Sequence, residues 1–195
     1  MGEFDKVRHD GGTALEKADL AIANRLLPLS GEVAVLAIGA ISDLSDQEPL
    51  YAASAGVIAT GTLLRDDRAL QTGLRMLATH LFATALRGVV KHSVDRTRPI
   101  AAAERGRYEL GLGERYESDF NSFPSGHTAG AVAVARVVAR RYPDASAAAL
   151  GLAAASAAAQ VLRSKHYVTD VVAGAAIGWL AEEVLHALLA RCERI

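Results

Sequence analysis

Six apolar segments separated by polar or charged stretches constrain the fold of this chain most strongly. Strand signals are nearly absent, so we predict an all-α fold, a bundle of six helices. At 195 residues the chain fits one domain. The apolar segments cover residues 32–41, 50–64, 70–90, 127–138, 145–162 and 171–190.

Hydropathy leaves two environments open for this bundle. A membrane-spanning helix needs about 20 mostly apolar residues, and few of the segments reach that length without a charge. A soluble bundle with an alanine-rich core is equally compatible with the pattern. The small-residue stretches ALGLAAASAAA and AGAAIG favour close helix packing inside a membrane.

The loop charges favour a transmembrane bundle whose N-terminus is cytoplasmic. With six crossings, the first outer loop, residues 42–49, contains no Lys or Arg, as the positive-inside rule expects. The second outer loop, 91–124, is rich in arginine, and phosphate binding would explain that exception. The basic residues predicted on the cytoplasmic side are Lys6, Arg8, Lys17, Arg25, Arg65, Arg68, Arg140, Arg141, Arg191 and Arg194.

Several classes of protein are disfavoured by simple features of the sequence. The net charge of -1 provides no basic field for a nucleic acid. The single cysteine, Cys192, cannot form an internal disulfide or a zinc cluster. The first 20 residues lack the apolar core of a signal peptide, so internal segments would direct the chain to a membrane. We divide the chain into a polar N-terminal segment, 1–30, which could form an amphipathic helix, and a helical domain, 31–195.

The first of three motifs, KHSVDRTRP, follows the third apolar segment. Pro99 disfavours helical backbone at Arg98, so the helix should stop before it. Lys91 at the helix end and Arg98 beyond it could converge on one anion, the lysine as a point charge and the arginine as a planar fork. The alternative is a basic loop that touches lipid headgroups.

The second motif, FPSGHT, opens the fourth apolar segment. Ser125 resembles a helix N-cap, and Gly126 permits close approach of the backbone. Free N–H groups at the start of a helix can cradle a phosphate. His127 would lie beside that phosphate and could transfer a proton near neutral pH. The alternative is a simple helix cap followed by a surface histidine.

The third motif, RSKHYVTD, joins the last two apolar segments. His166 and Asp170 are four residues apart, so one helical turn can bring the ring to the carboxylate. A carboxylate on one ring nitrogen would leave the other nitrogen free as a nucleophile. The alternative is that Asp170 only caps the last helix. In the six-crossing arrangement all three motifs fall on the same, outer side.

Together the motifs resemble the type 2 phosphatidic acid phosphatase (PAP2) superfamily over roughly residues 91–178. The matching pattern is Lys, six residues and Arg-Pro, then PSGH, then His, three residues and Asp. The resemblance implies a six-helix core and a phosphohistidine mechanism with no metal or other cofactor. By motif position, His166 corresponds to the nucleophile, Asp170 to its orienting carboxylate and His127 to the general acid. Phosphate binding is implied for Lys91, Arg98, Ser125 and Gly126.

One position departs from the family pattern. The family's third motif has Ser-Arg with five residues between that arginine and the histidine, but Ala159 and Gln160 stand there. Arg163, nearly one turn later, could supply the missing guanidinium, or Gln160 could bind phosphate as a neutral donor. The missing arginine is also compatible with low or unusual activity.

The sequence therefore predicts a multi-pass cell-membrane phosphatase whose active site faces the extracytoplasmic side. Its substrate would be a phospholipid or polyprenyl phosphate or diphosphate. A soluble acid phosphatase of the same superfamily and an inactive headgroup-binding protein are the alternatives. A metal site is disfavoured, because neighbouring Lys and Arg side chains would repel a cation. The residues that such a site would use are His92, Asp95, His127, His166 and Asp170.

Overall fold

The computed structural model describes residues 12–113 and 117–192, and its helices follow the predicted apolar segments closely. The long helices are α2 (Val33–Asp43), α3 (Gln47–Leu64), α4 (Asp67–Lys91), α6 (Gly126–Arg141), α7 (Ser146–Leu162) and α8 (Val168–Cys192). All six lie where the sequence predicts a helix, so the all-α fold class is confirmed. Helix α1 (Ala14–Leu26) precedes them and α5 (Pro99–Arg105) lies between α4 and α6.

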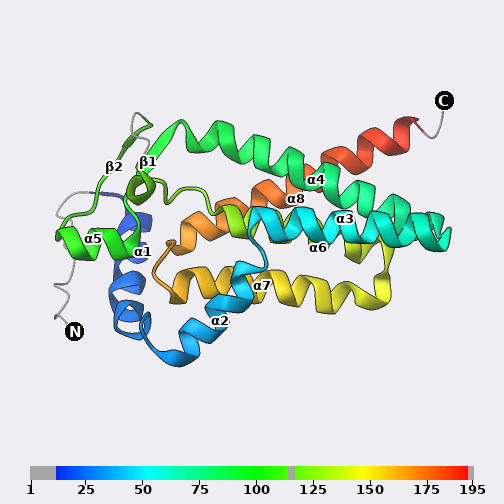
Figure 1. The fold of residues 1–195 in the computed structure, drawn as a ribbon. Helices are drawn as coiled ribbons and strands as arrows, with labels where there is room; N and C mark the ends of the chain where they lie inside the picture. The colour runs from blue at the N-terminus through cyan, green and yellow to red at the C-terminus, as the bar shows by residue number, and fades with distance from the viewer. Residues whose placement is uncertain (1–11, 114–116, 193–195) are drawn as a thin grey trace.

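Helices α3, α4, α6, α7 and α8 run along the long axis of the bundle (Figure 1). Helix α6 lies in the middle and contacts α4, α7 and α8. Its buried positions are mostly Ala, Gly and Val, which let the neighbouring helices approach. On α8, a Cβ at Gly174 would overlap the carbonyl oxygen of Ser125, and one at Gly178 would overlap that of Ala129. These two glycines therefore set the close contact of α8 with α6.

Charged side chains inside the bundle are paired between α6 and α8. Arg136 and Arg140 both donate to the buried carboxylate of Glu182, at 3.0 Å and 2.7 Å. Glu183 accepts from the same two arginines. Arg136 and Glu182 thus face the bundle, as membrane burial would require.

Residues 92–113 and 117–125, between α4 and α6, contain more secondary structure than the loop that the sequence predicts. Strand β1 (Val94–Arg96) pairs antiparallel with β2 (Leu110–Leu112), and α5 lies between them. Short 3₁₀ turns occur at Leu27–Leu29, Ser118–Phe120 and Pro143–Ala145. The hairpin gives Arg96 a fixed backbone position, which matters for the site below.

The position of α1 contradicts the assumed topology, in which the N-terminal segment lies opposite the motifs. Helix α1 packs across the motif end of the bundle (Figure 1), where Asp19 contacts Arg96 and Thr169. Helix α2 has 11 residues and spans about 16 Å, roughly half the apolar thickness of a bilayer. It is therefore too short to carry the chain from the far side. Lys6, Arg8 and Arg194 of the predicted cytoplasmic set lie outside the described residues.

Only some helices meet a simple test of length and apolarity for crossing a membrane. Within the described residues, Pro143–Leu162 and Val168–Cys192 pass it. The pair Ala14–Leu29 and Val33–Ala40 passes together, but it is bent by 107°. Helices α4 and α6 carry arginines that lower their mean hydropathy. Six crossings therefore stay a prediction.

Candidate active site

His166 lies in the turn between α7 and α8 and is 3 % exposed. Its Nδ1 lies 2.7 Å from the carbonyl oxygen of Ser122, so Nδ1–H donates to that oxygen when the ring is neutral. In the described part of the chain, Nε2 has no hydrogen-bond partner. Burial lowers the pKa of the imidazole, which keeps the ring neutral near pH 7. A neutral ring with one nitrogen anchored and the other free has the form of a nucleophile.

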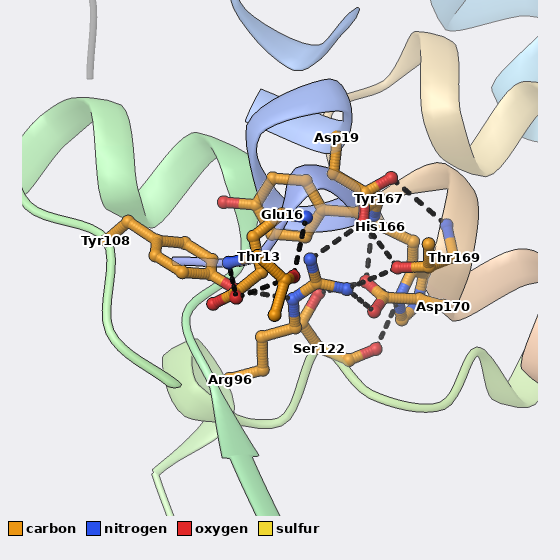
Figure 2. A network of polar contacts seen from close by, with 10 residues as sticks. All are labelled: Thr13, Glu16, Asp19, Arg96, Tyr108, Ser122, His166, Tyr167, Thr169 and Asp170. Atoms are coloured by element: carbon orange, nitrogen blue, oxygen red, sulfur yellow. Dashed lines mark hydrogen bonds and ion pairs between the residues drawn. The ribbon is translucent and has the colours of Figure 1, made fainter. Parts of the chain in front are cut away.

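Asp170 lies close to His166 but is not its nearest hydrogen-bond partner (Figure 2). Asp170 Oδ2 is 3.7 Å from His166 Nδ1, farther than the Ser122 carbonyl. The same oxygen accepts the Ser122 hydroxyl at 2.6 Å and the N–H of Tyr167 at 2.8 Å. The carboxylate thus holds both segments that flank the ring, and it lies beside Nδ1 as the four-residue spacing predicts.

Arg96 anchors Asp170 from the opposite side, and the sequence analysis gave it no such role. Its Nη1 donates to Asp170 Oδ1 at 2.6 Å and its Nη2 to Asp19 Oδ2 at 2.8 Å. Its backbone carbonyl accepts the N–H of Ser122 at 3.0 Å. Arg96 therefore ties α1, the hairpin and α8 to the two residues that position His166 (Figure 2).

No local pattern in the sequence identified this role. Arg96 ends β1, whereas Arg98, two residues later, is the N-cap of α5, so their backbones are positioned by different elements. Asp19 is 77 positions from Arg96 and lies in a polar segment. Ser122 acts through its carbonyl, which every residue has. The presence of a second arginine, Arg96, beside Arg98 in the first motif is the sequence feature that could have indicated it.

His127 begins the first turn of α6 and faces carboxylates at the end of α2 and start of α3. Its Nε2 is 3.8 Å from Asp46 Oδ2 and 4.0 Å from Asp43 Oδ1. It is also close enough to His166 for their charges to interact. The structure therefore brings the two predicted catalytic histidines together at one end of the bundle.

Two of the predicted phosphate binders, Lys91 and Arg98, share the site with His166. Lys91 is the last residue of α4 and interacts electrostatically with Arg98. Arg98 interacts in turn with His166, and its Nε donates to the carbonyl of Ser118 at 3.0 Å. Neither cation forms an ion pair within the described residues. Both are therefore available to an anion placed beside His166.

Ser125 and Gly126 lie at the start of α6, as the sequence predicts. Ser125 is the N-cap, and its oxygen accepts the N–H of Thr128. Ser125 is fully buried, and its own N–H donates to the carbonyl of Asp170 at 3.0 Å. Its phosphate-binding role stays a prediction. The N–H groups of Gly126 and His127 are in the first turn, where a helix leaves donors without intrahelical partners.

Arg163 and Gln160 both have protein partners in the structure. Arg163 Nη1 donates to Asp43 Oδ1 at 2.6 Å and to the carbonyl of Gly39 at 3.0 Å, so it fastens α2 to the end of α7. Gln160 is fully buried, and its Nε2 donates to Ser42 at 2.8 Å. A phosphate-binding role for either residue stays a prediction.

No group of three or more His, Cys, Asp or Glu side chains in the described residues is arranged to hold a metal ion. The five residues considered for a metal site are therefore not brought together for that purpose. His166 and Asp170 instead belong to the hydrogen-bonded network above, while the imidazole of His127 faces Asp43 and Asp46.

The sequence matches a known protein family, and the fold matches solved structures. The family model of the PAP2 superfamily matches residues 72–193. A search of curated protein sequences finds no significant match.

Two solved structures share the fold. A transmembrane PAP2-type phosphatidylglycerolphosphate phosphatase from Bacillus subtilis aligns with a TM-score of 0.70 at 21% identity, over 92% of this chain and 88% of that one. LpxE from Aquifex aeolicus aligns with a TM-score of 0.64 at 16% identity, over 90% and 96% of the two chains. At these identities the likeness concerns the fold.

Proposed function

Because this chain belongs to the PAP2 superfamily, we propose that it is a membrane lipid phosphatase that removes phosphate through a phosphohistidine intermediate without a metal ion. One observation carries the proposal. His166 is buried and neutral, its Nδ1 is anchored to Ser122, and its free Nε2 shares a site with Lys91, Arg98 and His127. The membrane setting is supported by the apolar helices and by the two structural neighbours.

In the proposed first step, Nε2 of His166 attacks phosphorus and the bond to the leaving alcohol oxygen breaks. Lys91, Arg98 and the N–H groups at the start of α6 stabilise charge on the phosphoryl oxygens. His127 gives its proton to the departing oxygen. In the second step water attacks the phosphohistidine, His127 accepts a proton from that water, and phosphate leaves.

Asp170 acts by positioning. It holds the Ser122 hydroxyl and the Tyr167 N–H, so both sides of the His166 ring stay fixed. Its negative charge, 3.7 Å from Nδ1, also stabilises the positive ring that develops during attack.

Phosphate release from a substrate panel tests this function. The detergent-purified protein is assayed with phosphatidate, phosphatidylglycerophosphate, a polyprenyl diphosphate and soluble phosphate monoesters. We expect release from at least one lipid, full rates in excess EDTA and inhibition by orthovanadate. Activity that is lost with chelator and restored by a metal would contradict the mechanism.

An inactive headgroup-binding protein is the second candidate. The observation in its favour is that Gln160 stands at the family's arginine position and is buried against Ser42. It predicts lipid phosphate binding with no release from any member of the panel. The panel therefore separates the two candidates.

A further inference from the structure

Arg87 lies on α4 one helical turn before Lys91, so the two side chains share a face of that helix. Its Nε donates to the carbonyl of Pro124 at 3.2 Å. This bond joins α4 to the PSGH segment just before α6 begins. Arg87 lies outside the three motifs of the family pattern.

The guanidinium of Arg87 occupies the space that a side chain at Gly126 would need. A Cβ added at Gly126 would lie 2.9 Å from Arg87 Cζ and 3.0 Å from Nε. The planar group therefore lies against the first residue of α6, where the free N–H groups point outward. A phosphate held by those N–H groups would be within reach of the same guanidinium.

Arg87 lies among positive charges, and the one carboxylate whose charge acts on it is that of Asp46, which forms no direct ion pair with it among the described residues. Arg87 interacts electrostatically with both Lys91 and Arg98, and all three carry positive charge. None of the three forms an ion pair with a carboxylate among the described residues. Within those residues only Nε of Arg87 has a hydrogen-bond partner, so both terminal nitrogens are free. Three partly buried cations that repel one another are stabilised by a shared anion.

We propose that Arg87 is a phosphate-binding residue that supplies the guanidinium missing from the third motif. This inference rests on the proposed function and extends its phosphate site to a helix that carries only Lys91 in the family pattern. The two sequence-based alternatives already have partners, since Arg163 is paired with Asp43 and Gln160 with Ser42. Arg87 can present two parallel N–H donors to two phosphate oxygens.

The test compares R87A and R87K with R163A and R68A in detergent-purified protein. Arg68 lies on the same helix at its opposite end, where it stacks on Tyr142, and serves as the control for loss of an arginine. The inhibition constant of orthovanadate, KM and the unfolding temperature are measured for each. We expect R87A to raise the vanadate constant about 10- to 100-fold, which is the usual effect of losing hydrogen bonds to a charged group.

The other variants refine that expectation. R87K keeps the charge but loses the fork, so its vanadate constant should lie between those of wild type and R87A. R68A should stay within about 3-fold of wild type, and R163A should shift less than R87A. A methyl group in G126A would displace the guanidinium, so G126A should weaken binding in wild type and add little in R87A.

The test of the Arg87 assignment can succeed or fail independently of the proposed phosphatase function. Vanadate binding is also followed by its effect on the unfolding temperature, which needs no turnover. If wild type binds vanadate through Arg87 but releases no phosphate, the proposed function fails and the Arg87 assignment stands. If R87A folds and keeps its vanadate constant within about 3-fold, or if R163A shows the larger loss, the Arg87 assignment is overturned. It is also overturned if neither R87A nor R87K folds, because Arg87 would then be structural.

Discussion

At the residue scale, the two histidines proposed as catalytic are distinguished by their surroundings. His166 is anchored through Nδ1 to a backbone carbonyl, whereas His127 faces the carboxylates of Asp43 and Asp46. A ring held at one nitrogen suits attack, and the charges of Asp43 and Asp46 favour the protonated form of His127 against the effect of its burial. The proposal assigns the first role to His166 and the second to His127 on these grounds.

This division of labour predicts different substrate dependence for two alanine variants. H166A should abolish turnover of every substrate. H127A should slow alkyl phosphates by about 10²–10⁴-fold, because a poor leaving group needs its proton. Release of an activated aryl alcohol should fall much less, which burst kinetics would show. Equal losses of the burst rate for the alkyl and the aryl substrate in H127A would contradict its role as the acid.

The pH dependence of kcat/KM provides a second test. Burial lowers the pKa of His166 from its usual value of 6.5, so the neutral nucleophile persists at pH values below that. Activity should therefore be present above this lowered pKa and be lost as pH falls through it. The positive charge of Arg98 contributes to the lowering, so R98A should move the acid limb to higher pH. A limb that stays in place in R98A would contradict the arrangement.

Residue types and spacing predicted part of the site, and geometry supplied the rest. His127, His166, Lys91 and Arg98 share one end of the bundle because each motif follows or opens a helix. The bond from His166 to the Ser122 carbonyl has no side-chain signature in the sequence. The pairing of Arg163 with Asp43 at the end of α2 likewise has no signature in the sequence.

At the element scale, α1 is part of the framework of the site. Asp19 is buried, bonds to Arg96 and accepts the N–H of Thr169 at 3.2 Å. Leu20 packs in the same cluster as Tyr108 and Tyr167. The sequence indicates only a polar N-terminal segment, because neither hydropathy nor motif spacing shows which helix a lone buried aspartate will contact.

Removing the Asp19 carboxylate should loosen this framework. D19A would leave one side of the buried Arg96 guanidinium unpaired, at a cost of about 2–4 kcal/mol in unfolding free energy. The rate should also fall, because Arg96 positions Asp170. Lys17 is exposed on the same helix, so K17A is the matched control. Denaturant unfolding in detergent measures the difference, and identical midpoints for D19A and K17A would refute this role.

The helices themselves were largely predictable. The six apolar segments coincide with α2, α3, α4, α6, α7 and α8, because long apolar runs bounded by polar residues specify helices regardless of partner. The β1–β2 hairpin was not predicted. Its strands have three residues each, and their pairing depends on contacts between segments distant in sequence.

At the scale of the whole molecule, α1 and the three motifs occupy the same end of the bundle, and the C-terminal end of α8, which is Cys192, lies at the other. If the motif end faces outward, α1 must face outward with it. The positive-inside argument then retains its support from Arg65, Arg68, Arg140, Arg141 and Arg191, which lie toward the opposite end. Lys17 and Arg25 move to the outer side.

Single-cysteine labelling tests this topology in intact cells. In a C192S background, K17C and E117C should both react with a membrane-impermeant maleimide, since both positions are exposed at the motif end. The native Cys192 in wild type should react only after permeabilisation. If K17C, like Cys192, reacts only after permeabilisation while E117C reacts in intact cells, the arrangement of α1 is contradicted.

The central claim is that His166 carries the phosphoryl group during turnover, and trapping that intermediate tests it most directly. Wild type and H127A are mixed with a phosphorus-labelled aryl phosphate and quenched in base, and the labelled peptide is mapped. We predict acid-labile, base-stable label on His166, at a higher level in H127A, because hydrolysis needs His127 as base. H166A should retain no label. Label that persists in H166A, or active wild type that never carries label, would contradict the account.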